Sequence, residues 1–373
     1  MNQQIIQGID KLPQILNDSG IKKLFIVTGS RSYASFNFKE LIDSLEMAKV
    51  FFTGFTPNPL NEQVCKGIDL FESEKCDGIL AIGGGTPMDV AKCIKVAVLA
   101  EEGKSAIIPP LVNTRVKIDG AKIPFIAIPT TAGTGSESTH NAVMYYEGSK
   151  QTVVNDGVLP DYALLEPSVL KSLPLYQKKC TMMDALCQGI ESWWSVNSTE
   201  ESYGYSRKTI ELIMQNWEAY IFENDSDAAE KIMFGANYGG RAINITATTA
   251  AHAMSYKITS LCKYPHGHAV ACCLPFIWKY MVGNMENIID PRGIDYLKDI
   301  FSKIATAMGC KSVEESINKF EDMMVRMELK QPVLNSPDEL AILIQSVNPI
   351  RLKNNPVYLS EEVLHDLYVD ITK

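Results

Sequence analysis

The sequence predicts an α/β fold with a mainly parallel, doubly wound sheet over residues 1–173, followed by an all-helical domain over residues 174–373. Three observations support this fold class. The chain of 373 residues is too long for one small hydrophobic core. Short apolar runs alternate with helical patterns up to about residue 170, which is typical of a parallel sheet. Beyond about residue 173 the apolar residues recur with helical spacing, and strand signals are nearly absent.

Each predicted strand of the first domain is a short apolar run that leads into a turn or a helix. The runs do not alternate apolar and polar residues, so we expect helices to cover both faces of the sheet. The predicted strands are Leu24–Gly29 (LFIVTG), Val50–Phe55 (VFFTGF), Gly78–Thr86 (GILAIGGGT) and the start of Pro124–Glu137 (PFIAIPTTAGTGSE). Helical spacing marks the segments SFNFKELIDSLE, Asn61–Cys76 and MDVAKCIKVAVLA.

The second domain consists of long segments with helical period. They cover roughly residues 179–196, 199–224, 227–243, 248–262, 267–282, 293–308, 313–329 and 360–371. A cleft between two domains is the usual place for a ligand, and we expect the functional site there.

The composition excludes several classes of function. A net charge of −9 argues against a surface for nucleic acid or for an anionic membrane. No apolar run reaches membrane-spanning length, and the N-terminus lacks the basic and apolar regions of a signal peptide. The nine cysteines are scattered without a CxxC pair. These features predict a cytoplasmic protein with reduced thiols that has neither a membrane nor a nucleic-acid partner.

Two glycine-rich turns follow predicted strands. In AIGGGTPMDVAK, a strand leads into Gly83, Gly84 and Gly85, and a helix begins near Pro87. Glycines let the backbone approach a ligand closely, and the amide groups at a helix start favour a phosphate. A GGG turn can also be a plain tight turn, but TTAGTGSE, which begins at Thr130, is a second glycine-rich turn of this kind. Two such turns at the carboxyl ends of neighbouring strands favour dinucleotide binding by a Rossmann-like domain.

A group of metal-ligating side chains occurs in the helical domain. His252 and His266 are fourteen residues apart, which is about four helical turns, with a break at Pro265 between them. Asp184 and Gln188 are four apart in DALCQGIESWWS, so both can point from one helix face. A carboxylate and two imidazoles directed at one point are typical of a catalytic divalent-metal site. The alternative is that these residues satisfy one another in the core of the helical domain.

Four motifs together carry a resemblance to a known family. GGGTPMDVAK, PTTAGTGSE, DALCQGIESWWS and HAMSYKITSLCKYPHGHAVA resemble the iron-containing (group III) alcohol dehydrogenases, in this order and over nearly the whole chain. Within that family the sequence is most similar to the phosphonoacetaldehyde reductases, also called hydroxyethylphosphonate dehydrogenases. The resemblance implies the fold shared by the dehydroquinate synthases and the iron-containing alcohol dehydrogenases.

The resemblance also implies a set of cofactor-binding residues. It implies that Gly83, Gly84, Gly85 and Thr86 hold the pyrophosphate of the dinucleotide, and that Asp89 belongs to the same motif. Thr130, Thr131 and Ser136 would line the cofactor, with Asn58 nearby. From the residues alone, Asn58 lies between two prolines and is equally a turn former.

The end of the first predicted strand bears on the choice between NADPH and NADH. Family members that use NAD usually have an acidic residue where this chain has Gly29. A carboxylate there would accept a hydrogen bond from the ribose 2′-hydroxyl and would repel a 2′-phosphate. Gly29 removes that repulsion, while Ser30 and Arg31 offer donors and a positive charge, so we expect NADPH. In the alternative, Arg31 is a solvated surface charge.

The metal ligands of the family are one Asp and three His, and this chain departs from that set. Asp184, His252 and His266 occupy matching positions, but Gln188 stands where the family has the third His. Tyr256 replaces a further histidine that is not a ligand. Either Asp184, Gln188, His252 and His266 hold Fe²⁺ or Zn²⁺, or the metal is lost and Tyr256 or an imidazole supplies the proton. Tyr256, His252 and His266 are therefore the predicted catalytic residues.

The predicted reaction is hydride transfer from NADPH to a small aldehyde, with the metal polarising the carbonyl oxygen. The predicted substrate is phosphonoacetaldehyde and the product 2-hydroxyethylphosphonate, with Arg241, Lys257 and Lys150 as candidate cations for the phosphonate. The alternatives are a generic primary alcohol or lactaldehyde dehydrogenase, a relative of the sugar-phosphate lyases, and a degenerate nucleotide-binding protein without activity. A homodimer is the expected assembly.

Overall fold

The computed structural model describes residues 3–29, 33, 38–108 and 122–373, and it divides into two compact units. Unit 1 comprises Met1–Thr131 and Gly135–Leu173, and unit 2 comprises Ala132–Thr134 and Pro174–Lys373. Three residues of the second glycine-rich turn thus belong with the helical unit. Ser30 and Arg31, which we predicted to contact the cofactor, lie outside the described residues.

Unit 1 is built on a parallel sheet whose described strands run in the order β1-β8-β5-β4-β2-β3. Every neighbouring pair in this sheet is parallel, which confirms the predicted fold class. The bounds of these strands are β1 Gln4–Gln7, β2 Lys23–Thr28, β3 Ala48–Phe52, β4 Gly78–Gly83, β5 Phe125–Pro129 and β8 Tyr162–Leu165. The sequence analysis predicted β2 to β5 and did not predict β1 and β8, the pair at one end of the sheet.

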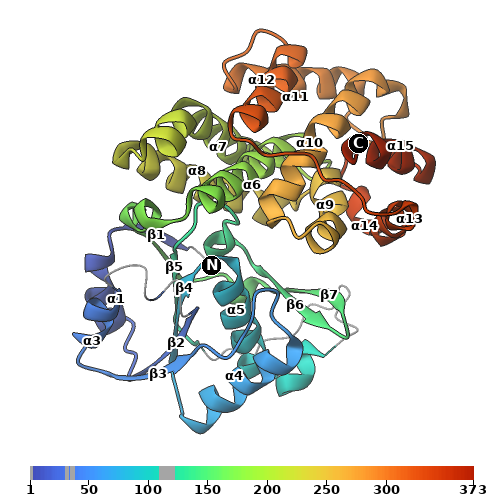
Figure 1. Ribbon diagram of the computed structural model, residues 1–373. Coiled ribbons are helices and arrows are strands. Elements are labelled where there is room, and N and C mark those ends of the chain that lie inside the picture. Colours follow the sequence, from blue (N-terminus) through green and yellow to red (C-terminus); the bar gives the residue numbers. More distant parts are fainter. Residues whose placement is uncertain (1–2, 30–32, 34–37, 109–121) are drawn as a thin grey trace. The chain divides into compact units, whose positions relative to one another are not determined.

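Helices cover both faces of this sheet, as the uninterrupted apolar strands predicted. In Figure 1, α1 (Leu12–Asp18) and α3 (Phe38–Asp43) lie on one face, and α4 (Asn61–Ser73) and α5 (Gly85–Leu99) lie on the other. The face under α4 and α5 forms one continuous core in which Phe25, Phe71 and Phe125 are buried together. This core anchors the first glycine-rich turn, because that turn joins β4 directly to α5.

Unit 1 also contains an antiparallel hairpin that the sequence analysis did not predict. β6 (Asn141–Tyr146) pairs with β7 (Ser149–Val154) across Glu147 and Gly148. Both turn residues have positive φ, 47° and 75°, which is the backbone that a tight two-residue hairpin requires.

Unit 2 is a bundle of helices, in agreement with the predicted all-helical domain. Its long central helix is α6 (Leu175–Trp194), which is buried along nearly all of Cys180–Trp194 and contacts α7, α8 and α10. The other helices are α7 Glu200–Glu218, α8 Ser226–Thr246, α9 Ala250–Leu261, α10 His266–Gly283, α11 Ile294–Ala307, α12 Val313–Arg326, α13 Pro337–Ser346, α14 Pro349–Leu352 and α15 Glu361–Ile371. The sequence analysis missed α13 and α14. Among the described residues, no helix combines the length and the apolar character needed to cross a membrane.

Candidate active site

Helix α6 carries three polar side chains into the interior of unit 2. Asp184, Gln188 and Glu191 are spaced by four and three residues, so they share one face of the helix. All three are buried, with 3% or less of each residue exposed. The sequence analysis selected the first two and missed Glu191. Its spacing on the same helix face was the signal that could have revealed it.

Helices α9 and α10 supply the two histidines. His252 is the third residue of α9, and His266 is the first residue of α10, directly after Pro265. The break that the sequence analysis placed at Pro265 is therefore present in the structure. Gly267 makes this arrangement possible, because a Cβ atom at this position would overlap the carbonyl oxygen of Cys180 and lie 2.7 Å from Cβ of Asp184.

The structure brings Asp184, His252 and His266 together at one point. One potential ligand atom from each residue lies within 4.8 Å of the others. Oδ1 of Asp184 is 3.3 Å from Nε2 of His252 and 4.0 Å from Nε2 of His266. The two imidazole rings are 5.3 Å apart between centroids and inclined by 67°. The three side chains therefore converge closely enough to ligate one ion.

Gln188, one turn after Asp184 on α6, offers a fourth candidate ligand atom, its amide oxygen. Its Nε2 donates to the carbonyl oxygen of Thr134, 3.4 Å away, which belongs to the same unit. Its Oε1 is buried and accepts no hydrogen bond from any described residue. Nε2 of His252 is also buried and lies 3.3 Å from Oδ1 of Asp184, with which it forms an ion pair when the ring is protonated. A buried polar atom without a partner, such as Oε1 of Gln188, is costly and needs a physical reason, and a bound cation would supply one.

Glu191 contacts the other ring nitrogen of His252, Nδ1. Its Oε2 contacts Nδ1 of His252, while its Oε1 accepts hydrogen bonds from the first turn of α9. Burial lowers the pKa of His252, but the carboxylates of Glu191 and Asp184 outweigh that effect and raise the pKa to about 10. In the metal-free protein this ring is a cation between two carboxylates. A metal ion would have to displace its proton.

Tyr256 lies one turn after His252 and stacks on the second histidine. The Tyr256 and His266 rings are nearly parallel, with an interplanar angle of 13° and centroids 5.7 Å apart. His266 is the most exposed of the three clustered residues, with 37% of its side chain accessible. The stacking restricts the orientation of that ring, so Tyr256 shapes the accessible side of the cluster.

The first glycine-rich turn of unit 1 is tightly folded. Gly83 has φ +150°, and a Cβ atom there would lie 2.5 Å from Cγ of Pro87. A Cβ atom at Gly84 would approach Oγ1 of Thr131 to 3.2 Å, so the two turns are in contact here. Helix α5 begins at Gly85 and includes Thr86 in its first turn. The turn therefore places backbone amides at a helix start, which suits a phosphate group.

Behind this turn, Asp89 and Ser136 belong to a buried network around Lys92. Nζ of Lys92 donates to the carbonyl and hydroxyl oxygens of Ser136, to Oγ1 of Thr139 and to the carbonyl of Asn141. The Ser136 hydroxyl in turn donates to Asp89, 3.3 Å away. Burial raises the pKa of Asp89 to about 6 and lowers the pKa of Lys92 to about 8. This network connects α5, which follows the first glycine-rich turn, to Ser136 in the second turn and so fixes the two turns relative to each other.

The remaining predicted cofactor residues lie at three places in unit 1. Thr130 directly follows β5 and donates its backbone N–H to the carbonyl oxygen of Gly83, 3.0 Å away. Gly29 is the residue after β2. Asn58 is exposed with φ 59°, a backbone conformation that suits the turn-former interpretation. Their contacts with a dinucleotide remain predictions.

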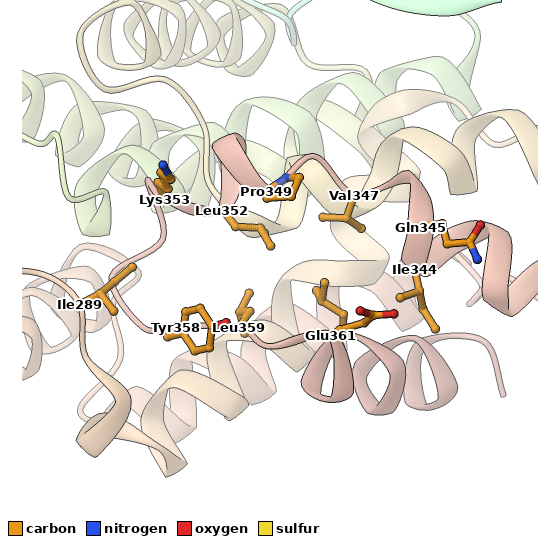
Figure 2. Close-up of a pocket in the computed structure, with 11 residues that line it drawn as sticks. Ile289, Ile344, Gln345, Val347, Pro349, Leu352, Lys353, Tyr358, Leu359 and Glu361 are labelled. Atoms are coloured by element: carbon orange, nitrogen blue, oxygen red, sulfur yellow. The ribbon is translucent and has the colours of Figure 1, made fainter.

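A separate cavity of about 500 Å³ lies among the C-terminal helices of unit 2. Figure 2 shows its mostly aliphatic lining, with Lys353 toward one end and Glu361 and Gln345 toward the other. None of the candidate metal ligands lines it. The polar side chains in its lining are those of Gln345, Lys353, Tyr358 and Glu361, and histidine, cysteine and aspartate are absent from the described residues that line it.

Comparison with known proteins decides the family. The family described as "Iron-containing alcohol dehydrogenase" matches residues 2–167, and "Fe-containing alcohol dehydrogenase family, C-terminal" matches residues 179–370. This chain belongs to the iron-containing alcohol dehydrogenase family. It is an oxidoreductase of the alcohol or aldehyde dehydrogenase type.

Individual relatives of the iron-containing alcohol dehydrogenase family show the same likeness. A phosphonoacetaldehyde reductase of Streptomyces viridochromogenes is 30% identical over 78% of this chain and 75% of its own length. The probable alcohol dehydrogenase EutG of Escherichia coli is 28% identical over 70% of this chain, and the match spans 66% of that protein. The solved structure of a sulfoacetaldehyde reductase from Bifidobacterium kashiwanohense in complex with NAD⁺ has a TM-score of 0.87. It is 25% identical, over 100% of this chain and 97% of that one.

The iron-containing alcohol dehydrogenases use NAD(H) and a divalent metal ion. The cluster in unit 2 fits such an ion, because it combines a carboxylate, two imidazoles and a buried amide oxygen that accepts no hydrogen bond from the described residues. Gln188 replaces a nitrogen ligand with a neutral oxygen. In the sense of hard and soft ligands, this makes the ligand set harder than one with three imidazoles.

Proposed function

We propose that this protein reduces a small aldehyde to a primary alcohol at the expense of a reduced nicotinamide cofactor, with a divalent ion held by Asp184, Gln188, His252 and His266. The observation that carries the proposal is the convergence of Asp184, His252 and His266. One turn along α6 from Asp184, Gln188 adds a buried Oε1 that accepts no hydrogen bond from the described residues. The overall reaction converts the aldehyde, one hydride from NAD(P)H and one proton to the alcohol and NAD(P)⁺.

Each part of the proposed site would have a separate role in the reaction. A bound Fe²⁺ or Zn²⁺ would polarise the carbonyl oxygen and stabilise negative charge that develops on it. The glycine-rich turns with Gly83, Gly84 and Gly85 would bind the pyrophosphate through backbone amides. Tyr256, stacked on His266 at the accessible side of the cluster, is our candidate to deliver a proton to the new alcohol.

The proposed substrate is phosphonoacetaldehyde or a closely similar two-carbon aldehyde with an anionic group. The support is the 30% identity to a phosphonoacetaldehyde reductase and the likeness to a sulfoacetaldehyde reductase, two enzymes named for aldehydes of this kind. Half-buried Lys257, directly after Tyr256 on α9, is the cation best placed along the chain to meet such a group. Arg241 is less suited, because its guanidinium donates to the Tyr205 hydroxyl, 2.6 Å away, and lies over that ring.

A substrate panel tests this proposal. NADPH and NADH oxidation would be followed with phosphonoacetaldehyde, sulfoacetaldehyde, lactaldehyde, propionaldehyde and acetaldehyde. The proposal predicts a higher kcat/KM for the two anionic aldehydes, and Lys257→Met should raise KM for these two alone. Equal kcat/KM across the panel would favour a generic primary alcohol or lactaldehyde dehydrogenase. Nucleotide binding without turnover of any aldehyde would favour a degenerate member.

Two further features complete the proposal. We propose a cytoplasmic location, which the nine cysteines support because all of them are free thiols in the structure. We also propose a homodimer, which measurement of the molar mass in solution would test directly.

A further inference from the structure

We propose that Glu191 is a positioning residue for the candidate metal site: its carboxylate fixes the tautomer and the orientation of the His252 ring, so that the lone pair of Nε2 faces Asp184. This inference rests on the metal site proposed above. Neither the family match nor the predicted ligand set assigns a role to Glu191.

One oxygen of Glu191 is held by the start of α9. Oε1 accepts hydrogen bonds from the Thr249 hydroxyl at 2.7 Å and from the backbone N–H groups of Thr249, Ala251 and His252 at 3.1–3.3 Å. Thr249 precedes α9 but its side chain caps none of the helix amides. The carboxylate therefore serves as the N-cap of α9 from another helix, and this fixes its position.

The second oxygen is then left facing the imidazole. Oε2 contacts Nδ1 of His252, and both side chains are buried. An ionised carboxylate only accepts hydrogen bonds, so Nδ1 must carry the hydrogen. In a neutral ring the free lone pair is then on Nε2, which lies 3.3 Å from Oδ1 of Asp184. This is the tautomer that a metal ligand needs at that position, and an acidic partner on the other ring nitrogen is a common way to enforce it.

Glu191→Gln would separate the two roles of the side chain. The amide oxygen must keep the Oε1 position, because the backbone N–H groups of α9 need an acceptor there. The amide NH₂ group would then face Nδ1 of His252 and donate to it. That donation favours the opposite tautomer, with the hydrogen on Nε2, and so opposes metal binding while the cap of α9 remains.

The experiment measures Zn²⁺ affinity by competition with a chromophoric chelator, together with the d–d spectrum of the Co²⁺-loaded protein. Glu191→Gln should weaken Zn²⁺ binding by about 10–100-fold and alter the Co²⁺ spectrum. Thr249→Val is the matched control, since it removes a hydrogen bond to Oε1 and leaves the Oε2–ring contact in place. The control should lower the thermal stability of the metal-free protein without changing the Co²⁺ spectrum.

The outcomes separate this inference from the proposed function. If the wild-type protein binds no divalent ion, the proposed metal site is wrong and this inference falls with it. If the wild type binds Zn²⁺ and Glu191→Gln binds it equally with the same Co²⁺ spectrum, the metal site stands and the positioning role is wrong. Should Glu191→Gln fail to fold, ¹⁵N-histidine NMR of the Zn²⁺-loaded wild type decides. We expect a proton on Nδ1 of His252, and coordination through Nδ1 would overturn the inference.

Discussion

At the scale of single residues, His252 links the chemistry of the site to pH. Its pKa of about 10 exceeds the ordinary value of 6.5, so the folded metal-free protein holds a proton that the unfolded chain releases between these values. The stabilisation from this proton is complete below pH 6.5 and is lost as the pH rises through 10. Metal binding has the opposite pH dependence, because the ion replaces the proton.

We therefore expect metal binding at pH 7.5 to release about one proton from His252 for each ion bound, and the affinity to rise about tenfold per pH unit toward alkaline pH. Calorimetric titration in two buffers with different ionisation enthalpies measures the protons released. The variant His252→Gln lacks the titrating ring and should release fewer protons. Binding to the wild-type protein without proton release would contradict the electrostatic description of this site.

Gly29 should control the choice between NADPH and NADH. Gly29→Asp places a carboxylate at the end of β2, where it would repel a 2′-phosphate and accept from a ribose 2′-hydroxyl. The expected result is a fall in the ratio of kcat/KM for NADPH to that for NADH by about tenfold or more, equivalent to about 1.4 kcal/mol. Asn17→Asp adds the same charge on the exposed side of α1 and should leave the ratio unchanged. An unchanged ratio in Gly29→Asp would refute the cofactor assignment.

Ala247 carries backbone strain directly before α9. Its φ of 54° and ψ of −179° fall in a region that only glycine adopts readily, and such a residue costs about 1–3 kcal/mol. The conformation is held by hydrogen bonds from neighbouring Thr246 and from Asn354, whose Nδ2 donates to Thr248. The strain thus sets the direction in which the chain enters α9 and its histidine.

Replacing Ala247 by glycine should relieve this strain. We expect Ala247→Gly to raise the free energy of unfolding by about 1 kcal/mol, after the entropic cost of a glycine is subtracted. Ala242→Gly in the buried interior of α8 is the control and should lower stability by about 1 kcal/mol. Chemical denaturation measures both. Equal destabilisation by the two substitutions would show that the backbone at Ala247 is unstrained.

Residue-level prediction from the sequence selected the three side chains that converge in unit 2 and missed the carboxylate of Glu191 that contacts one of them. Asp184, His252 and His266 could be selected because metal-ligating residue types recur at helical spacing. Glu191 offered a spacing signal, but its function depends on where α9 begins relative to α6, which is a property of tertiary packing. The buried hydrogen bonds of Lys92 could not be predicted for the same reason.

At the scale of elements, the site depends on how closely α10 approaches α6. Gly267→Ala would place a methyl group against the Cys180 carbonyl and Asp184. We expect it to weaken Zn²⁺ binding by at least about tenfold and to lower stability by about 1–3 kcal/mol, because the two helices must separate. Gly283→Ala at the other end of α10 meets nothing within 4 Å and is the matched control. Unchanged Zn²⁺ affinity in Gly267→Ala would mean that this close approach does not position the ligands.

Long, strongly periodic elements were predicted well, and short or interrupted ones were not. β2, β4 and β5 are mostly apolar runs and β3 ends in one, and α6 to α12 and α15 carry clear helical spacing. β1 and β8 have only four residues each, and β1 is polar at both ends, so neither stands out in the sequence. α13 and α14 each begin with a proline and are shorter than most helices of unit 2, which weakens their periodic signal.

At the scale of the whole molecule, the sequence predicted an α/β part and a helical part. The sequence did not predict that the boundary between the two units runs through TTAGTGSE. Ala132–Thr134 belongs to unit 2, and Gly133 packs against Thr181 of α6. The second glycine-rich turn is therefore shared, with Thr130, Thr131 and Ser136 in unit 1. One short segment thus carries predicted cofactor residues, and its Gly133 packs against α6, the helix that carries Asp184 and Gln188.

The central claim is that Asp184, Gln188, His252 and His266 hold the divalent ion on which the reductase activity depends. The most direct test is the metal content of protein purified without chelators, measured by elemental analysis for the wild type and for His252→Ala. The account predicts about one Fe²⁺ or Zn²⁺ per wild-type chain and almost none in the variant. Equal metal content and equal aldehyde reduction in the two proteins would contradict it.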